Sequence, residues 1–436
     1  MRARHNLSPL ALGSLLLVWA CGTAATSPVP NNDAGDVVDA RVADANESRD
    51  DAASDSSTSS DSGEKDAAKD GALDGTLDAS DAGPDAADAA PDNFVPPTPA
   101  VRYIGRFEDT DVNGQRAGWP ASRTVVRFDG TELSATLAHV NGFNGGPTYL
   151  DVIVDGVVQN TPLAVPVGTS TFTVVSGLAA GTHTVEFVKR TEAQHGVVQF
   201  KSFTFPNGGQ LLAPPAARTR RIEVMGNSAI SGYGVDGAGP NCAGGATPAT
   251  YNARKSGAQV AADALSADLV LLGYGGKGVT KNITAGDNIT LPILFERTLP
   301  ETGAFNWSYA KYVPDAFVMV ITNIDAETAE PTLTNAYEAF AIKIRAAYPN
   351  AFISLVVSAA ATDDYPVGLM TRTKLKAMAA SVVAKRKAAG DQNVSNHAMT
   401  EYVNGQLSGC DYHPNEALHN QMGAELVSFL KADLGW

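Results

Sequence analysis

The pattern of apolar residues changes at a Pro- and Arg-rich joint, residues 214–221, and this change constrains the fold more than any other feature. Before the joint, the chain contains short, β-branched and often alternating runs, separated by turn residues such as Asp-Gly pairs. After it, short apolar runs alternate with longer stretches of helical spacing. Strands alone indicate a sandwich or a barrel, whereas alternating strands and helices indicate a parallel sheet. The sequence therefore predicts two domains of different fold class.

The first domain is expected over residues 101–210 as an all-β, jelly-roll-like sandwich. Its strands are expected at residues 125–128, 133–137, 149–154, 170–175 and 183–188. The second domain is expected over residues 218–436 as a three-layer α/β/α domain, because the connecting helices cover both faces of a parallel sheet. Its strands are expected at residues 222–225, 268–272, 317–321 and 352–357. Its helices are expected at residues 253–265, 334–348, 371–389 and 416–434.

Residues 22–100 have a composition of their own, rich in Asp, Ala, Ser, Gly and Pro and with hardly any aromatic residue. Within them, residues 31–92 contain 18 acidic and 4 basic residues, a net charge of −14. Such a segment cannot bury enough apolar surface to offset its ordering entropy, and its like charges keep it extended. The spacing of Asp and Gly is too irregular for calcium-binding repeats. The sequence predicts a disordered acidic linker.

Residues 1–21 are typical of an export signal, with two arginines before an apolar core that is too short to span a bilayer comfortably. The core ends in Ala-Cys-Gly, which is similar to a bacterial lipobox and makes Cys21 the expected lipid anchor. We expect an exported protein, anchored at the bacterial outer membrane or cell surface. Trp19 is unusual in a lipobox, so plain secretion is the alternative.

Charge and cysteine content exclude several classes of partner. Residues 93–436 contain 29 acidic and 26 basic residues, a net charge of −3, and so offer no basic face to nucleic acid. Besides Cys21 the chain has two cysteines, Cys242 and Cys410, which we expect to form a disulfide in an oxidising compartment. Two cysteines alone cannot build a zinc site, and neither a metal nor an organic cofactor is expected. A monomer is expected.

Two positions suggest nucleophilic catalysis. Ser228 follows the apolar run 222–225, at the carboxyl end of the expected first strand, where open parallel sheets bind ligands. Gly-Asn-Ser is also a common turn sequence, so this position alone is not specific. His413 and Asp411 lie two residues apart, so an extended loop can direct both side chains the same way. The carboxylate would then fix the imidazole while its other nitrogen faces the nucleophile.

Short motifs from residue 101 to the C-terminus occur in the order found in a known family. They are Ile104-Gly105-Arg106-Phe107, Lys189-Arg190-Thr191-Glu192-Ala193, Arg221-Ile222-Glu223, Gly275-Gly276-Lys277-Gly278-Val279, Asn306-Trp307-Ser308, Pro314-Asp315, Cys410-Asp411-Tyr412-His413-Pro414 and Leu434-Gly435-Trp436. With them the chain resembles carbohydrate esterase family 2, a branch of the SGNH (GDSL-like) hydrolases that includes acetylxylan esterases. The resemblance implies an SGNH-type fold and a serine esterase that removes O-acetyl groups from polysaccharide.

The resemblance also implies a role for each matching residue. Ser228 matches the nucleophile and His413 the general base, with Asp411 as the acidic residue two positions before it. Some members orient this histidine through a main-chain carbonyl, so the role of Asp411 stays open. The main-chain N–H groups of Ser228 and Gly276 match two oxyanion donors, each worth ~3 kcal/mol. Trp307 and Tyr412 could line a sugar-binding cleft, and the alternative is that both are packing residues.

The chain departs from the family at three positions. It has Asn227 where the family has Asp, and Gly275 where the family has Ser. The family ends its third strand in Gly-Thr-Asn-Asp and uses the Asn as a third oxyanion donor, but residues 322–325 put Ile324 at that position. Asn323 can replace it only if the loop shifts by one residue. Losing a donor costs ~10²- to 10³-fold in turnover, so the alternative function is a weakened or inactive glycan-binding protein. A third possibility keeps the chemistry but takes peptidoglycan or another surface polymer as substrate.

Overall fold

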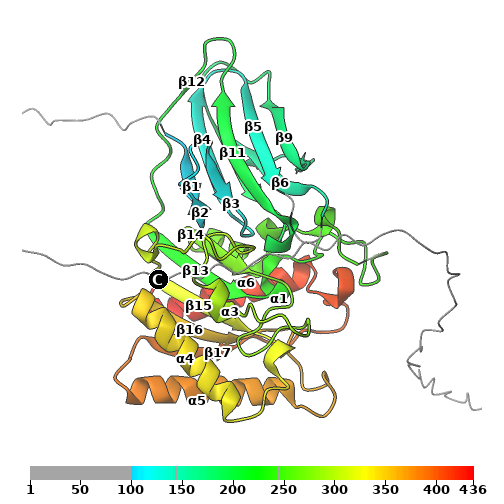
Figure 1. Cartoon of the computed structure of the whole chain (residues 1–436), viewed down its shortest axis with the longest axis vertical. Coiled ribbons are helices and arrows are strands. Elements are labelled where there is room, and N and C mark those ends of the chain that lie inside the picture. The colour runs from blue at the N-terminus through cyan, green and yellow to red at the C-terminus, as the bar shows by residue number, and fades with distance from the viewer. Residues whose placement is uncertain (1–99, 141, 143–144, 244) are drawn as a thin grey trace, which may run out of the picture. The chain divides into compact units, whose positions relative to one another are not determined.

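The structure is a computed structural model that describes residues 100–140, 142, 145–243 and 245–436 (Figure 1). The expected signal, the Cys21 anchor and all but the last residue of the expected acidic linker lie outside the described residues. No helix within the described ranges is both long enough and apolar enough to cross a membrane.

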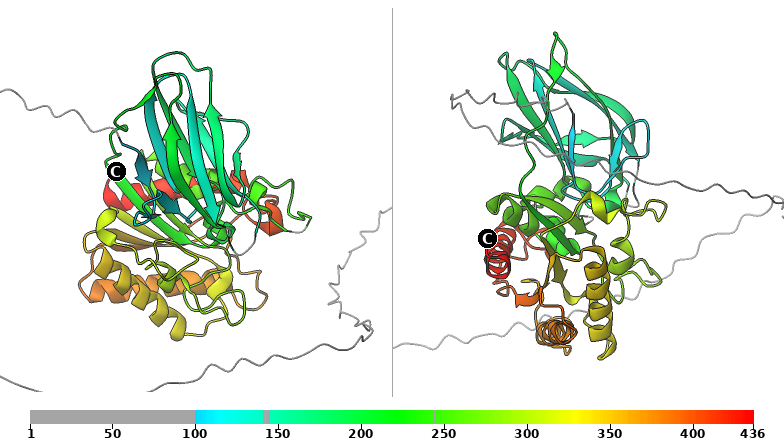
Figure 2. Two further views of the ribbon diagram at one scale, coloured as in Figure 1. Left: turned by 45° about the horizontal axis from the view of Figure 1, so that its top comes forward. Right: turned by 90° about the vertical axis from the view of Figure 1, so that its left-hand side faces the viewer.

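Residues 102–211 form two antiparallel sheets that face each other (Figure 2). The first contains β1 (Arg102–Ile104), β4 (Arg123–Asp129), β10 (Thr182–Lys189), β6 (Thr148–Val154) and β7 (Val157–Val158), with β8 (Leu163–Val165) and β12 (Gln210–Leu211) beside it. The second contains β2 (Phe107–Glu108), β3 (Gln115–Ala117), β11 (Val197–Thr204), β5 (Leu133–Val140) and β9 (Gly168–Val175). Every strand that the sequence predicts is present, and β11, which lacks a clear alternating pattern, is the longest of those that it did not predict.

Alternating side chains from both sheets fill the sandwich. Along β5, buried and half-buried residues alternate, as expected for a strand with one face on a core. Phe128, Phe187 and Phe200 lie in the resulting cluster and are at most 3% exposed. The sandwich of the predicted fold class is therefore confirmed, whereas the exact domain limits stay predictions.

A second, all-parallel sheet begins at residue 220. Its strand order is β14 (Ala267–Gly273), β13 (Arg220–Gly226), β15 (Ala316–Ile321), β16 (Phe352–Val357) and β17 (Val394–Ala398). Parallel pairs join β13 to both β14 and β15, so the chain's first strand of this sheet lies inside it and the strand order reverses there. The crevice at such a reversal, beyond the carboxyl ends of the strands, is where these folds bind ligands.

Helices cover both faces of the parallel sheet, which confirms the predicted three-layer architecture (Figure 1). On one face lie α4 (Thr332–Ala347) and α5 (Thr371–Ala388), and on the other lie α2 (Gly257–Ala264) and α6 (Glu416–Leu434). The helix expected at residues 253–265 is divided, because the Ser256 hydroxyl accepts the N–H of Gln259 and so starts α2 after a short 3₁₀ turn.

A buried ion pair joins the sandwich to the parallel sheet. Arg106, between β1 and β2, lies 2.5 Å from the carboxylate of Glu223 on β13, and both side chains are fully buried. The same guanidinium donates to the main-chain oxygen of Phe295, and Tyr348 donates to Glu223, so the charges are well compensated. Residues before and after the joint at residues 214–221 therefore share an interior.

Candidate active site

Ser228 is the first residue of the short helix α1 (Ser228–Ser231), directly after β13. The side-chain oxygen of Asn227 accepts the N–H of Ala229 at 3.1 Å and so caps this helix. The amide nitrogen of Asn227 donates to the hydroxyl of Thr322, in the loop after β15. A carboxylate at this position could contact the same hydroxyl only by accepting its proton, so Asn keeps the contact but reverses the direction of the hydrogen bond.

His413 meets Ser228 across the carboxyl edge of the sheet. Its Nε2 lies 2.8 Å from the Oγ of Ser228, which is a normal hydrogen-bond distance. Its Nδ1 lies 3.1 Å from the main-chain oxygens of both Cys410 and Asp411. A carbonyl only accepts, so Nδ1 carries the proton and Nε2 is free to accept the proton of the serine. The pair is arranged for attack by an activated hydroxyl.

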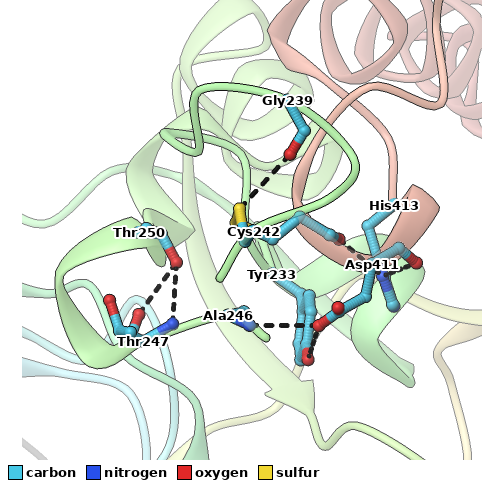
Figure 3. Close-up of a disulfide and its surroundings, with 9 residues drawn as sticks. Tyr233, Gly239, Cys242, Ala246, Thr247, Thr250, Asp411 and His413 are labelled. Carbon is cyan, nitrogen blue, oxygen red and sulfur yellow. Dashed lines mark hydrogen bonds between the residues drawn. A yellow bond between two sulfur atoms is a disulfide. The ribbon is translucent and has the colours of Figure 1, made fainter. Parts of the chain in front are cut away.

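The carboxylate of Asp411 is directed away from His413 (Figure 3). It accepts the phenol O–H of Tyr233 at 2.7 Å and the N–H of Ala246 at 3.0 Å. The backbone of Asp411 is left-handed, with φ of 55°, and not extended as the sequence argument assumed. The prediction that this carboxylate fixes the imidazole is therefore wrong. The main-chain oxygens of Asp411 and Cys410 fix the imidazole instead, by accepting the proton on Nδ1 of His413.

Two further contacts hold the histidine loop. The ring of Tyr233 stacks on the imidazole of His413, with centroids 4.0 Å apart. Cys242 and Cys410 form a disulfide with Cα atoms 5.2 Å apart, which links the loop after α1 to the loop that carries the histidine (Figure 3). Burial lowers the pKa of His413, and the two main-chain acceptors offset this effect only in part. The imidazole therefore stays neutral, and able to accept a proton, below its ordinary pKa.

The main-chain N–H groups of Ser228 and Gly276 are available to a ligand. Within the described part of the chain, neither N–H donates to a protein acceptor. The loop after Gly276 is held by the buried carboxylate of Asp325, which accepts the N–H groups of Val279 and Thr280. The oxyanion of an acyl-transfer reaction needs donors beside the nucleophile, and the assignment of these two N–H groups to that role stays a prediction.

The predicted third donor, Asn323, follows the Thr322 that contacts Asn227. Its side chain is half-buried, and so is that of Ile324, the residue in the family's donor position. Among the described residues, the Asn323 amide makes no side-chain hydrogen bond with the protein, so its donor role stays a prediction.

The two aromatic residues proposed to contact sugar have different surroundings. Trp307 is 6% exposed and lies in the core, with the Arg106 guanidinium 5.1 Å from its ring. Its assignment to a sugar-binding surface is wrong, because the buried arginine and the core occupy its faces. Tyr412, beside His413, is 58% exposed, and its phenol donates to Asn241 at 3.1 Å. Its role in substrate binding stays a prediction.

Sequence reasoning assigned no role to Tyr233 or to Glu192. Glu192 is fully buried, and burial raises the pKa of its carboxyl to about 7. A signal was present, since three charged residues, Lys189, Arg190 and Glu192, cluster where β10 ends. Buried charges without a visible local partner indicate a contact from elsewhere in the fold. Across the described ranges, no three His, Cys, Asp or Glu side chains gather as a metal site.

Comparison with known proteins places this geometry in context. Residues 103–215 match the family model described as "Carbohydrate esterase 2 N-terminal". The cellulase/esterase CelE of Acetivibrio thermocellus is 32% identical over 342 residues, which is 78% of this chain and 40% of CelE. The chain thus spans less than half the length of this relative. An acetylxylan esterase/glucomannan deacetylase of Cellvibrio japonicus is 27% identical over 78% of this chain and 90% of its own length.

One solved structure is matched over its whole length. It is a family two carbohydrate esterase from Clostridium thermocellum in complex with cellohexaose. The two chains are 31% identical, with a TM-score of 0.70. The match extends over 77% of this chain and 100% of that one, so it includes both the sandwich and the parallel sheet.

Proposed function

This chain belongs to carbohydrate esterase family 2, and on that premise we propose that it is a serine esterase that removes O-acetyl groups from polysaccharide. One observation carries the proposal. The Nε2 of His413 lies 2.8 Å from the Oγ of Ser228, while its Nδ1 is held by main-chain carbonyls. This arrangement fixes both the tautomer and the direction of the proton acceptor.

Acylation begins when the Oγ of Ser228 attacks the carbonyl carbon of the acetyl group and its proton passes to Nε2 of His413. The carbonyl oxygen becomes an oxyanion, which the N–H groups of Ser228 and Gly276 stabilise. We assign the amide of Asn323 as the third donor. When the tetrahedral intermediate collapses, Nε2 returns the proton to the leaving sugar oxygen, and the acetyl group stays on Ser228.

Deacylation repeats the same steps with water. The oxygen of a water molecule attacks the acetyl-serine while Nε2 of His413 accepts a proton from that water. The same donors stabilise the second oxyanion. Collapse restores the hydroxyl of Ser228, which takes the proton from His413, and releases acetic acid, which ionises to acetate in water. These steps use only side chains and main-chain groups of this protein.

The substrate class follows from the relatives. One is named for acetylxylan and glucomannan, and another binds cellohexaose, so we propose an acetylated polysaccharide of this kind. Tyr412 is exposed beside His413, and aromatic faces suit sugar rings, so we assign it to the sugar-binding surface. Tyr412→Ala should then raise KM for acetylated xylan but leave KM for p-nitrophenyl acetate nearly unchanged.

We further propose that the protein acts outside the cytoplasm, as a monomer held by a lipid on Cys21. The sequence of residues 1–21 and the disulfide between Cys242 and Cys410 support export, because disulfides persist in oxidising compartments. Replacing Cys21 with Ala should move the protein from the membrane fraction to the soluble fraction. If the variant stayed in the membrane fraction, a lipid anchor on Cys21 would be contradicted.

The test of the proposed activity is acetate release from p-nitrophenyl acetate and from acetylated xylan, with wild type beside Ser228→Ala. Wild type should release acetate from both, and the variant should lose about 10⁴-fold or more of kcat. Binding of xylan without acetate release would contradict the esterase and support a glycan-binding protein instead.

A further inference from the structure

One buried carboxylate of the sandwich lies beside the candidate active site. Glu192 lies in the turn after β10 and is fully buried. Its two oxygens accept different groups of the parallel-sheet domain. One accepts the hydroxyl of Ser231, and the other accepts the N–H of Gly275 at 2.8 Å.

Both groups that Glu192 binds are close neighbours of the catalytic atoms. Ser231 is the last residue of α1, whose first residue is Ser228, and its hydroxyl also lies 3.2 Å from the Ser228 main-chain oxygen. Gly275 directly precedes Gly276, whose N–H is the second oxyanion donor. One carboxylate therefore connects the nucleophile helix to the oxyanion loop.

The close approach of these groups explains the glycine at position 275. A Cβ atom on Gly275 would lie 2.7 Å from the carboxylate of Glu192 and 3.6 Å from the Cβ of Ser228. The first distance is shorter than a van der Waals contact, so a side chain here would displace the carboxylate. The backbone at Gly275 is thus packed closely against both Glu192 and Ser228.

The turn that carries Glu192 is itself well fixed. The ammonium group of Lys189 is fully buried and donates to Thr191 O, Thr191 Oγ1 and Glu192 O at 2.8, 3.0 and 3.0 Å. These three acceptors match its three protons. Arg190 in the same turn donates to Asp151 in the sandwich and to Asp236 in the loop after α1. The turn has few ways to move without breaking buried bonds.

We propose that Glu192 is a positioning residue for the esterase reaction, through which the sandwich fixes the distance between Ser228 and the Gly276 oxyanion donor. The inference rests on the proposed function and adds a group from outside the catalytic domain to it. Glu192 touches no reacting atom. It acts through Ser231 and Gly275, and a displacement of either would misalign the nucleophile and the oxyanion hole.

The principal variant is Glu192→Gln, which keeps the size of the side chain but offers one acceptor oxygen instead of two. The Gly275 N–H can only donate, so the remaining oxygen should face it, and the Ser231 hydroxyl loses its carboxylate acceptor. We expect kcat for p-nitrophenyl acetate to fall about 10- to 100-fold, with KM changed less than about threefold. The control is Glu108→Gln, which removes a carboxylate that is 3% exposed and whose hydrogen-bond partners among the described residues are Thr110 and Arg116, both in the sandwich. It should lower Tm without changing kcat per folded molecule.

A double-mutant cycle keeps the inference testable if Glu192→Gln does not fold. Ser231→Ala removes one of the two partners and should lower kcat about tenfold with little change of KM. Combined with Glu192→Gln, it should cost much less than the product of the two single effects, because both changes remove the same bond. A kcat of either single variant within twofold of wild type, or effects that simply multiply, would overturn the inference.

The rate at which a fluorophosphonate probe labels Ser228 separates this inference from the proposed function. If wild type is labelled but releases no acetate, the proposed esterase fails. Slower labelling of Glu192→Gln and Ser231→Ala than of Glu108→Gln then still supports the positioning role. Equal labelling rates of all three variants would overturn it.

Discussion

The two members of the catalytic pair are held in place by different means. Ser228 follows the inner strand β13, and its neighbours Asn227 and Ser231 are bonded to buried groups from other elements. His413 lies on a loop beyond the sheet, after two exposed residues in left-handed conformations. Its position depends on two main-chain carbonyls, a stacked Tyr233 ring and a disulfide.

This difference shows that the nucleophile gains its rigidity from the core, whereas the histidine gains it from local cross-links. Truncating a buried core side chain costs about 2–5 kcal/mol, and buried contacts of this kind are lost together when the domain unfolds. Local cross-links can be removed one at a time while the sheet remains intact. Removing one contact of His413 should therefore lower kcat only in part. Removing one buried contact next to Ser228 should lower kcat strongly in a single step.

The largest effect is expected on the nucleophile side, at Asn323. If its amide is the third oxyanion donor, Asn323→Ala should lower kcat about 10²-fold with little change of KM, because the donor acts on the transition state. Steady-state hydrolysis of p-nitrophenyl acetate measures this, with Ile324→Val as the control. An unchanged kcat would remove Asn323 from the oxyanion hole, and Ile324→Asn should then raise kcat.

A smaller effect is expected from the disulfide. Replacing both Cys242 and Cys410 with Ala should lower kcat about tenfold, because the loop that carries His413 loses its link to the loop after α1. The free energy of unfolding should also fall by about 2–4 kcal/mol. Denaturant unfolding and kinetics on the same preparation give both values. A stability loss without any change of kcat would show that the disulfide does not position the histidine.

A still smaller effect is expected at Asp411. Asp411→Asn keeps the left-handed backbone and the main-chain oxygen that accepts from His413, so kcat should fall less than about fivefold. A carboxylate that fixed the imidazole would instead cost about 10⁴-fold on the same change. Kinetics of this single variant therefore distinguishes a main-chain acceptor from a triad acid.

The pH profile of wild type supplies the last test. Burial lowers the pKa of His413, and a base must be neutral to act. Activity should therefore persist as pH falls through 6.5, the ordinary pKa of histidine, and be lost only at a lower pH. The profile of kcat/KM against pH measures this midpoint. A midpoint above 6.5 would indicate a carboxylate that stabilises the imidazolium.

Sequence patterns predicted most of the fold because strands and helices are encoded locally. Apolar runs located β13, β14, β15 and β16 to within a few residues, whereas β17, with Ser, Asn and His in its five residues, gave no apolar signal. The family resemblance, together with the expected place of each residue in the fold, pointed to Ser228 and His413, which the structure brings together.

The errors concern contacts between distant residues. Trp307 looked like a sugar contact because nothing in its neighbourhood shows that Arg106, 201 positions earlier, packs on its ring. Asp411 was misassigned because a left-handed φ cannot be read from a two-residue spacing. Glu192 was missed because its partners belong to the other domain.

The bonds of Glu192 also bear on how such a catalytic domain can be transferred between genes. A gene fusion that carries residues 218–436 without their own sandwich would leave the Ser231 hydroxyl and the Gly275 N–H without their acceptor. A foreign sandwich of similar shape would cover the same surface but would need a glutamate at this one position. Recombination at the joint is therefore unfavourable, although the joint looks like an ordinary interdomain boundary. The smallest unit that can be exchanged is the sandwich together with its parallel-sheet partner.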